Sequence, residues 1–217
     1  MTGLSTSPRV LKAGIVQIDV ASGAVRQVIA LQYNPERLTR SLQPRASDTP
    51  GRGGPLRLRG PAVERYQLEA VLDAADQLEV PASFPAVVAD GLQPQLSALE
   101  LLLHPTTGQL EDRRRLADLG MLEVAPIEAP LALFVWGGRR VAPVRITDLS
   151  IVEEAFDPRL NPIRATVTIA MAVLGPDELG ARHRGAALHL GYLKVKEELA
   201  RSAPGRPLDA LGLGAVP

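Results

Sequence analysis

The stretch IRATVTIAMAVL, residues 163–174, decides the fold class, because its side chains alternate between apolar and polar with a period of two. Such alternation is typical of a β-strand with one face on a core and one face in solvent. The turn sequence DPRLNP precedes it at residues 157–162, and a second long strand is predicted from about Arg140 to Phe156. The two strands and their turn predict a long antiparallel hairpin.

The predicted strand at residues 140–156 changes face partway along. Its apolar residues fall first at even positions, Val144 and Ile146, and then at odd positions, Leu149 and Ile151. Because successive strand residues point to opposite faces, this shift of one residue predicts a β-bulge or sharp bend.

Four further segments have the composition of strands. Residues 13–20 and 24–33 are rich in Val and Ile and flank Ala21-Ser22-Gly23, which predicts a second hairpin. From residue 64 to 73 the side chains alternate between apolar and polar. The set predicted to face a core is Tyr66, Leu68, Ala70 and Leu72. The set predicted to face solvent is Arg65, Gln67, Glu69 and Asp73. Residues 131–136 form a continuous apolar run that ends at two glycines. The total is about six strands.

Leucine spacing predicts helices between the strands. One begins with Asp90 as its N-cap, tolerates Pro94 in its first turn and stacks four leucines on one face: Leu92, Leu96, Leu99 and Leu103. A weaker helix is predicted at 109–122. A terminal helix is predicted from about residue 178 or 184 to 200, with one stripe of Leu188, Tyr192, Val195 and Leu199. The rest is predicted as loop: 39–61 (long and mobile), 76–89, and the tail 202–217.

These elements predict a mainly β, α+β fold. We expect one β-rich domain at residues 1–176, followed at 177–217 by a C-terminal helix and a flexible tail.

Composition excludes several classes of function. The chain of 217 residues has 24 basic and 24 acidic side chains, so no global field favours nucleic acid or an anionic membrane. It has no cysteine, which excludes disulfides and thiolate metal sites. Residues 1–10 lack the apolar core of a secretory signal, and no apolar stretch approaches the roughly 20 residues of a membrane span. We therefore expect the protein in the cytoplasm unless a larger particle carries it out.

The pattern of reactive residues predicts no enzyme, cofactor or metal site. His183 and His189 are six residues apart, not the four that place two imidazoles on one helix face. Glu153 and Glu154 are neighbours on a strand and therefore point to opposite faces. The aromatic residues are predicted to anchor the core; they are Phe134, Trp136 and Phe156.

The predicted loop at 39–61 carries four arginines: Arg45, Arg52, Arg57 and Arg59. They are candidates for contact with an acidic partner, and the alternative is an ordinary solvated loop with scattered arginines.

The order of several short strings resembles a known family. They are YNPE (residues 33–36), PLALFVWG (residues 130–137), and FDP and NPIRA within residues 156–165. With the alternating strand and leucine helix between them, they resemble the N-terminal domain of the tube protein of contractile injection systems, the phage-tail-like particles. The resemblance covers residues 13–174.

The resemblance implies a tail-tube-like split antiparallel β-barrel with one flanking helix. It implies a hexameric tube-initiator or adaptor ring between the spike trimer and the inner tube at the baseplate. The partners would be spike, inner-tube subunits and other baseplate components. Relatives often continue into a LysM module, for which residues 201–217 are too short, so glycan binding is not expected.

The resemblance also implies a set of residues that face the lumen or a neighbouring subunit. These are Arg26, Gln32, Arg65, Glu69, Arg164 and Thr166. The arginine loop and residues 178–217 are implied contacts with another ring or with the spike.

Two other functions stay open at this point. One is a component of the tube shaft or its cap. The other is a split-barrel protein that holds a flavin-like or other small ligand in its cleft, with the basic loop contacting its phosphate.

Overall fold

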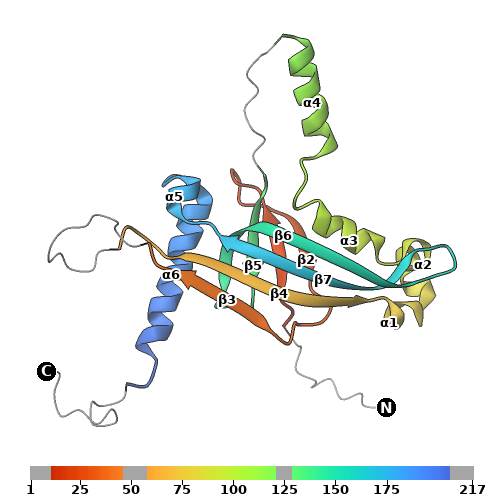
Figure 1. Ribbon diagram of the computed structural model, residues 1–217, viewed down its shortest axis with the longest axis horizontal. Coiled ribbons are helices and arrows are strands. Elements are labelled where there is room, and N and C mark those ends of the chain that lie inside the picture. The colour runs from red at the N-terminus through yellow and green to blue at the C-terminus, as the bar shows by residue number, and fades with distance from the viewer. Residues whose placement is uncertain (1–10, 46–57, 121–128, 206–217) are drawn as a thin grey trace, which may run out of the picture.

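The computed structural model describes residues 11–45, 58–120 and 129–205. Its centre is one antiparallel sheet with the strand order β2-β1-β5-β6-β7-β4-β3 (Figure 1). The strands are β1 (Gly14–Ile18), β2 (Val25–Ala30), β3 (Leu38–Gln43), β4 (Val63–Asp73), β5 (Leu131–Val135), β6 (Val141–Phe156) and β7 (Pro162–Val173). The mainly β, α+β class is therefore confirmed.

The sheet curls but does not close within the described residues, where β2 and β3 each have a hydrogen-bonded strand on one side only. Across the seam, the Gln32 side chain accepts a hydrogen bond from the Asp73 backbone N–H at 2.8 Å and donates one to the Asp73 carbonyl. This double contact holds the end of the β1–β2 hairpin against the end of β4 without joining the two strands in a ladder.

Strand β3 corrects the prediction that residues 39–61 are all loop. It pairs with β4 from Leu38 opposite Leu68 to Gln43 opposite Val63. The strand was missed because five of its six residues are exposed, so it has no apolar face to give a period-two signal. The glycine-rich remainder of the predicted loop, residues 46–57, lies outside the described residues.

The predicted hairpins and their bulge are confirmed. β1 pairs with β2 from Gly14 opposite Ala30, and β6 pairs with β7 along nearly its whole length. The register of β6 against β7 shifts between Ile146 and Asp148, as the change of apolar parity predicts. A second irregularity lies between Glu153 and Phe156.

The segment predicted as loop, residues 76–89, is instead covered by three short helical elements: α1 (Ala75–Leu78), η1 (Pro81–Ser83) and α2 (Pro85–Asp90). Asp90 ends α2, and the leucine helix α3 (Gln93–Glu100) has Leu92 as its N-cap, so the predicted capping role of Asp90 is wrong. Leu92, Leu96 and Leu99 are buried as predicted, whereas Leu103 is exposed beyond the end of the helix.

Three helices follow: α4 (Thr107–Asp118), α5 (Pro176–Leu179) and α6 (Arg184–Arg201). The buried face of α6 differs from the predicted stripe; it consists of Gly185, Ala186, His189 and Tyr192. Gly185, at the start of α6, packs closely against Leu131 of β5 and Leu179 of α5, whereas Leu199, near the other end of the helix, is exposed. None of the helices in the described ranges is long and apolar enough to cross a membrane.

The core lies between the inner face of the sheet and the helices α3 and α6. Phe134 is fully buried, with its ring centroid 5.2 Å from that of Tyr66. Trp136 is half-buried and packs on Phe134 at 5.9 Å. Phe156 is 48% exposed at the end of β6, so its predicted place in the core is wrong.

Candidate assembly surface

The outer face of the sheet is polar across four adjacent strands. Residues directly opposite each other in a ladder point to the same face, and Glu69 lies opposite Thr168 while Asp73 lies opposite Arg164. Four of the six residues implied by the resemblance therefore share this polar face: Arg65, Glu69, Arg164 and Thr166.

Glu154 links two of these residues. Its carboxylate accepts a hydrogen bond from Thr166 Oγ1 at 2.9 Å and forms an ion pair with Arg164 Nε at 3.3 Å. The strand irregularity around Glu154 brings this side chain to the polar face. The sequence offers no clear signal for it, because the apolar pattern has already faded at this end of β6.

An open groove of about 1010 Å³ lies beside the polar face. Its lining includes the YNPE turn at 33–36 and side chains of β4 and β7 such as Gln67, Glu69 and Arg164. The turn therefore forms one wall of the groove. Asn34 fixes this turn by donating to the Leu11 carbonyl at 2.7 Å and accepting from the Ala13 N–H at 2.9 Å.

Arg26 and Gln32, the other two implied residues, are not part of the polar face. Gln32 bridges the seam to Asp73. Arg26 forms an ion pair with Asp19 at the far end of the β1–β2 hairpin. The set predicted as one surface is thus divided among three places: the polar face, the seam and the hairpin end.

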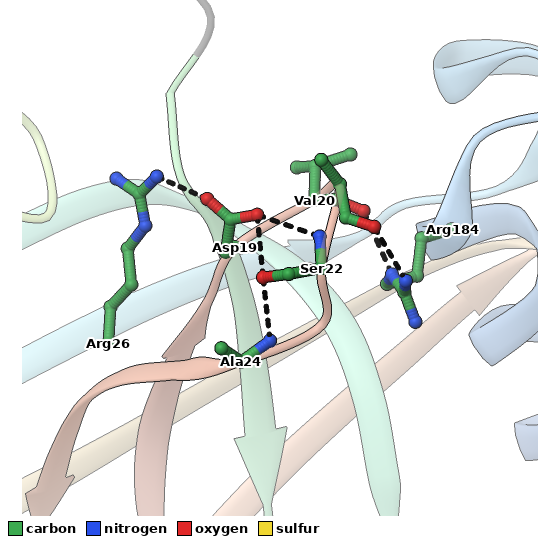
Figure 2. A network of polar contacts seen from close by, with 7 residues as sticks. Asp19, Val20, Ser22, Ala24, Arg26 and Arg184 are labelled. Carbon is green, nitrogen blue, oxygen red and sulfur yellow. Dashed lines mark hydrogen bonds and ion pairs between the residues drawn. The ribbon is translucent and has the colours of Figure 1, made fainter.

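The hairpin end at Asp19 is held by a dense set of polar contacts (Figure 2). The Asp19 carboxylate accepts from the Ser22 N–H at 2.8 Å and from the Ser22 hydroxyl at 2.9 Å. These bonds, with the Arg26 guanidinium, hold the pKa of Asp19 well below its ordinary value. On the other side of the turn, Arg184 of α6 donates to the carbonyls of Val20 at 2.8 Å and Ala21 at 2.9 Å. The hairpin end and α6 are therefore joined.

The two edges of the sheet carry exposed aliphatic side chains. Val25 and Val28 are exposed on β2, and Leu42 is exposed on β3. An edge strand also presents backbone N–H and C=O groups that have no ladder partner on one side. Each edge is therefore able to pair with a strand of another chain.

Two of the four loop arginines are described, and both close the base of the loop. Arg45 forms an ion pair with Asp177 of α5 at 2.6 Å, and the Arg59 N–H donates to the Arg45 carbonyl at 2.9 Å. Arg52 and Arg57 lie outside the described residues.

A buried polar network joins α6 to β4 beneath the sheet. Glu64 Oε1 accepts from the Tyr192 hydroxyl at 2.8 Å, and Glu64 Oε2 pairs with Lys196 Nζ at 2.6 Å. The Tyr66 hydroxyl is hydrogen-bonded to that of Tyr192. Burial raises the pKa of Glu64, but the bonds from Lys196 and Tyr192 outweigh it and hold the pKa below its ordinary value.

Sequence reasoning missed this network. Glu64 shares the even-numbered face of Tyr66 and Leu68, and this parity was the one signal that the carboxylate is buried. Among the described residues, no group of three or more His, Asp or Glu side chains is placed to hold a metal ion.

Comparison with known proteins finds only structures of low similarity. No protein-family model matches the sequence, and no curated protein matches it. Among solved structures, one match is a chain in the tail of an empty gene transfer agent particle refined with C6 symmetry. Its TM-score is 0.29 and its sequence identity is 14%, and the match covers 75% of this chain and 91% of that one. The fold is also similar to a chain in the virion of a native gene transfer agent particle, with a TM-score of 0.28 and 13% identity over the same shares. At these scores neither likeness assigns a function.

Proposed function

We propose that the chain is a non-enzymatic structural component of a contractile, phage-tail-like particle. In this proposal, copies of the chain close into a hexameric ring that joins the spike to the inner tube at the baseplate. The observation that carries the proposal is the open sheet, whose two edge strands each lack a neighbour on one side in the part of the chain that the structure describes.

Two different edges suit a ring better than a two-fold dimer. If β2 of one copy pairs with β3 of the next, every copy gives one edge and receives another. Such head-to-tail contacts close when the rotation between copies permits. The exposed Val25, Val28 and Leu42 then become buried between subunits.

Two of the motifs that carry the sequence resemblance lie at turns. YNPE lies between β2 and β3, and residues 157–161 form the β6–β7 turn, whereas the LALFV run is the strand β5. The two turns fix how consecutive strands follow one another, which supports the proposed likeness to a tube protein.

The polar face is suited to line a channel. Arg65, Arg145 and Arg164 share it with Glu69, Asp73, Asp148 and Glu154. Opposite charges are interspersed, so no single sign dominates a passing cargo. A small-ligand pocket, by contrast, is enclosed and mostly apolar, whereas the groove beside this face is open and mainly polar.

Negative-stain imaging of the purified protein, alone and with the spike protein, tests the proposal. We expect rings or short stacks for the wild type. Val28→Lys and Leu42→Lys should abolish them, because a lysine on an edge strand opposes pairing. Val152→Lys is the matched control, since this exposed valine lies on the interior strand β6. A monomer that carries a visible-wavelength chromophore, with no ring under either condition, contradicts the proposal.

A further inference from the structure

Within the described part of the chain, helix α4 has no buried residue, and Figure 1 shows it standing clear of the sheet. A helix of 12 residues is marginal in water when nothing packs against it. The capping box of Thr106 and Gln109 stabilises only its first turn. Such a helix gains stability when another surface packs against it.

One face of α4 is apolar and basic. At about 100° per residue, four residues fall within an arc of about 100°: Leu110, Arg113, Arg114 and Ala117. We call this set the α4 face. The acidic residues of the helix lie outside the arc, and Arg115, also outside it, pairs with Asp112 at 3.5 Å. The helix as a whole is neutral, but the α4 face carries two positive charges.

A second unpartnered surface lies where α1, η1 and α2 meet the β6–β7 turn. Its apolar residues are all exposed; they are Val80, Phe84, Val88 and Leu160. Three acidic residues belong to the same helical segment: Asp76, Glu79 and Asp90. Residues 75–90 contain no Lys or Arg, and the exposed Arg159 of the adjoining turn is paired with Asp157. We call these seven residues the tip surface.

The tip surface is held firmly in place. Arg159 donates to the Val88 carbonyl, and Asn161 donates to the Ala89 carbonyl at 2.9 Å. Asp157 accepts from the backbone N–H groups of Arg159 at 2.7 Å and Asn161 at 2.9 Å, and it also pairs with the Arg159 guanidinium. Leu160, 78% exposed, is thereby kept at a φ of +66°, a conformation that a leucine adopts only under constraint.

We propose that the α4 face docks on the tip surface of a second copy of this chain. The two surfaces are complementary, because each has exposed aliphatic residues and the charges are of opposite sign. They lie apart in one molecule (Figure 1), so the contact joins one copy to the next. This inference rests on the proposed assembly of copies and adds to the sheet edges a second, charge-dependent contact between them.

Reciprocal charge reversal tests the docking. The first variant is Arg113→Glu/Arg114→Glu, which makes the α4 face acidic, and the second is Glu79→Lys/Asp90→Lys, which makes the tip surface basic. Each alone should self-associate about tenfold more weakly than the wild type in sedimentation velocity. An equimolar mixture should recover association, because each altered surface then meets an altered partner. Arg139→Glu/Arg182→Glu changes two exposed arginines outside both surfaces and should behave as wild type.

Disulfide trapping tests the contact directly, because the chain has no cysteine of its own. A Leu110→Cys chain mixed with a Phe84→Cys chain of larger size should give a mixed disulfide. Asp112→Cys, on the opposite side of α4, is the control and should give much less. If Leu110→Cys and Asp112→Cys give equal yields of mixed disulfide with Phe84→Cys, the inference is overturned. It is also overturned if a single chain that carries both Leu110→Cys and Phe84→Cys forms only an intramolecular disulfide at low concentration.

The same variants separate this inference from the proposed function. Rings that persist unchanged in Arg113→Glu/Arg114→Glu overturn the docking and leave the function standing. Suppose instead that mixed disulfides form and the charge-reversed pair recovers association, but no wild-type preparation contains rings. That result supports the docking and counts against the ring.

Discussion

Glu64 brings a negative charge into the contact between β4 and α6, where its side chain is 5% exposed. Its carboxylate is stabilised there by Lys196 and Tyr192, which satisfy both oxygens. A buried charge costs free energy unless it is paired and hydrogen-bonded. Removal of one partner therefore leaves a buried polar group at the contact between β4 and α6 unpaired.

Glu64→Ala should lower the free energy of unfolding by about 2–3 kcal/mol, because it leaves the Lys196 ammonium and the Tyr192 hydroxyl without their acceptor. Urea denaturation measures the loss. Glu64→Leu/Lys196→Met removes the carboxylate and the ammonium together. Of the charges paired with Glu64 it leaves only Arg40, which lies 3.8 Å away and reaches solvent, so it should cost less than Glu64→Ala. A double variant as unstable as the single one contradicts this account.

His189 predicts a dependence of stability on pH. Burial, and then the charge of Lys196, lower the pKa of this imidazole, whose Nδ1 has no hydrogen-bond partner. The unfolded chain then binds a proton below about pH 6.5 that the folded chain resists. The free energy of unfolding should fall as the pH drops from 7 to 5, measured by urea denaturation at each pH. His189→Gln should flatten this slope, and an unchanged slope would count against the buried imidazole as its source.

Glycine at position 91 is required where α2 meets β7. Gly91 has a φ of +58°, and a Cβ there would lie 2.3 Å from the Pro162 carbonyl oxygen. The neighbouring Leu92 N–H donates to that same oxygen at 2.8 Å. The close approach of the two elements therefore depends on the missing side chain.

Gly91→Ala should lower the free energy of unfolding by about 2–4 kcal/mol, through both backbone strain and the clash with Pro162. Thermal and urea unfolding measure the change. Gly138→Ala is the control, since nothing lies within 4 Å of its added methyl group. Equal stability of the two variants would contradict the close approach.

Element by element, the sequence predicts the parts of the fold where burial alternates. Strand β7 and the bulge in β6 were predictable because each buried residue leaves an apolar mark at a known parity. Strand β3 has no such apolar pattern, because it is held by hydrogen bonds to its partner strand while most of its side chains stay exposed. The α1–η1–α2 segment was missed because its prolines, normally helix breakers, occupy first-turn positions.

The candidate surface was predictable only in part, and for a related reason. Arg65, Glu69, Arg164 and Thr166 share a face because strand parity fixes it. Arg26 and Gln32 fall elsewhere because the curl of the sheet separates β2 from β4 except at the seam. Curl and strand irregularity depend on three-dimensional packing, which a one-dimensional pattern does not record.

For the whole molecule, a closed ring predicts a difference in access between two surfaces. Gln67→Cys lies on the polar face, and in a ring it should react with a small maleimide but resist a bulky polymer-linked one. Val28→Cys, on the β2 edge, should resist both, because the next subunit covers it. Arg182→Cys, an exposed residue away from both, should react with either reagent. Gel shifts of assembled and monomeric fractions measure the labelling, and equal access at position 67 to both reagents in assembled protein argues against a channel.

The bond from the Arg59 N–H to the Arg45 carbonyl has a practical consequence. It pins the two points where the chain leaves and rejoins the sheet region, so added residues between them do not pull on β3 or β4. Each doubling of the intervening length changes the closure entropy by only about 0.6 kcal/mol. An affinity tag or fluorescent reporter inserted after residue 51 should therefore leave the folded scaffold intact, which offers a handle for following the protein in living cells.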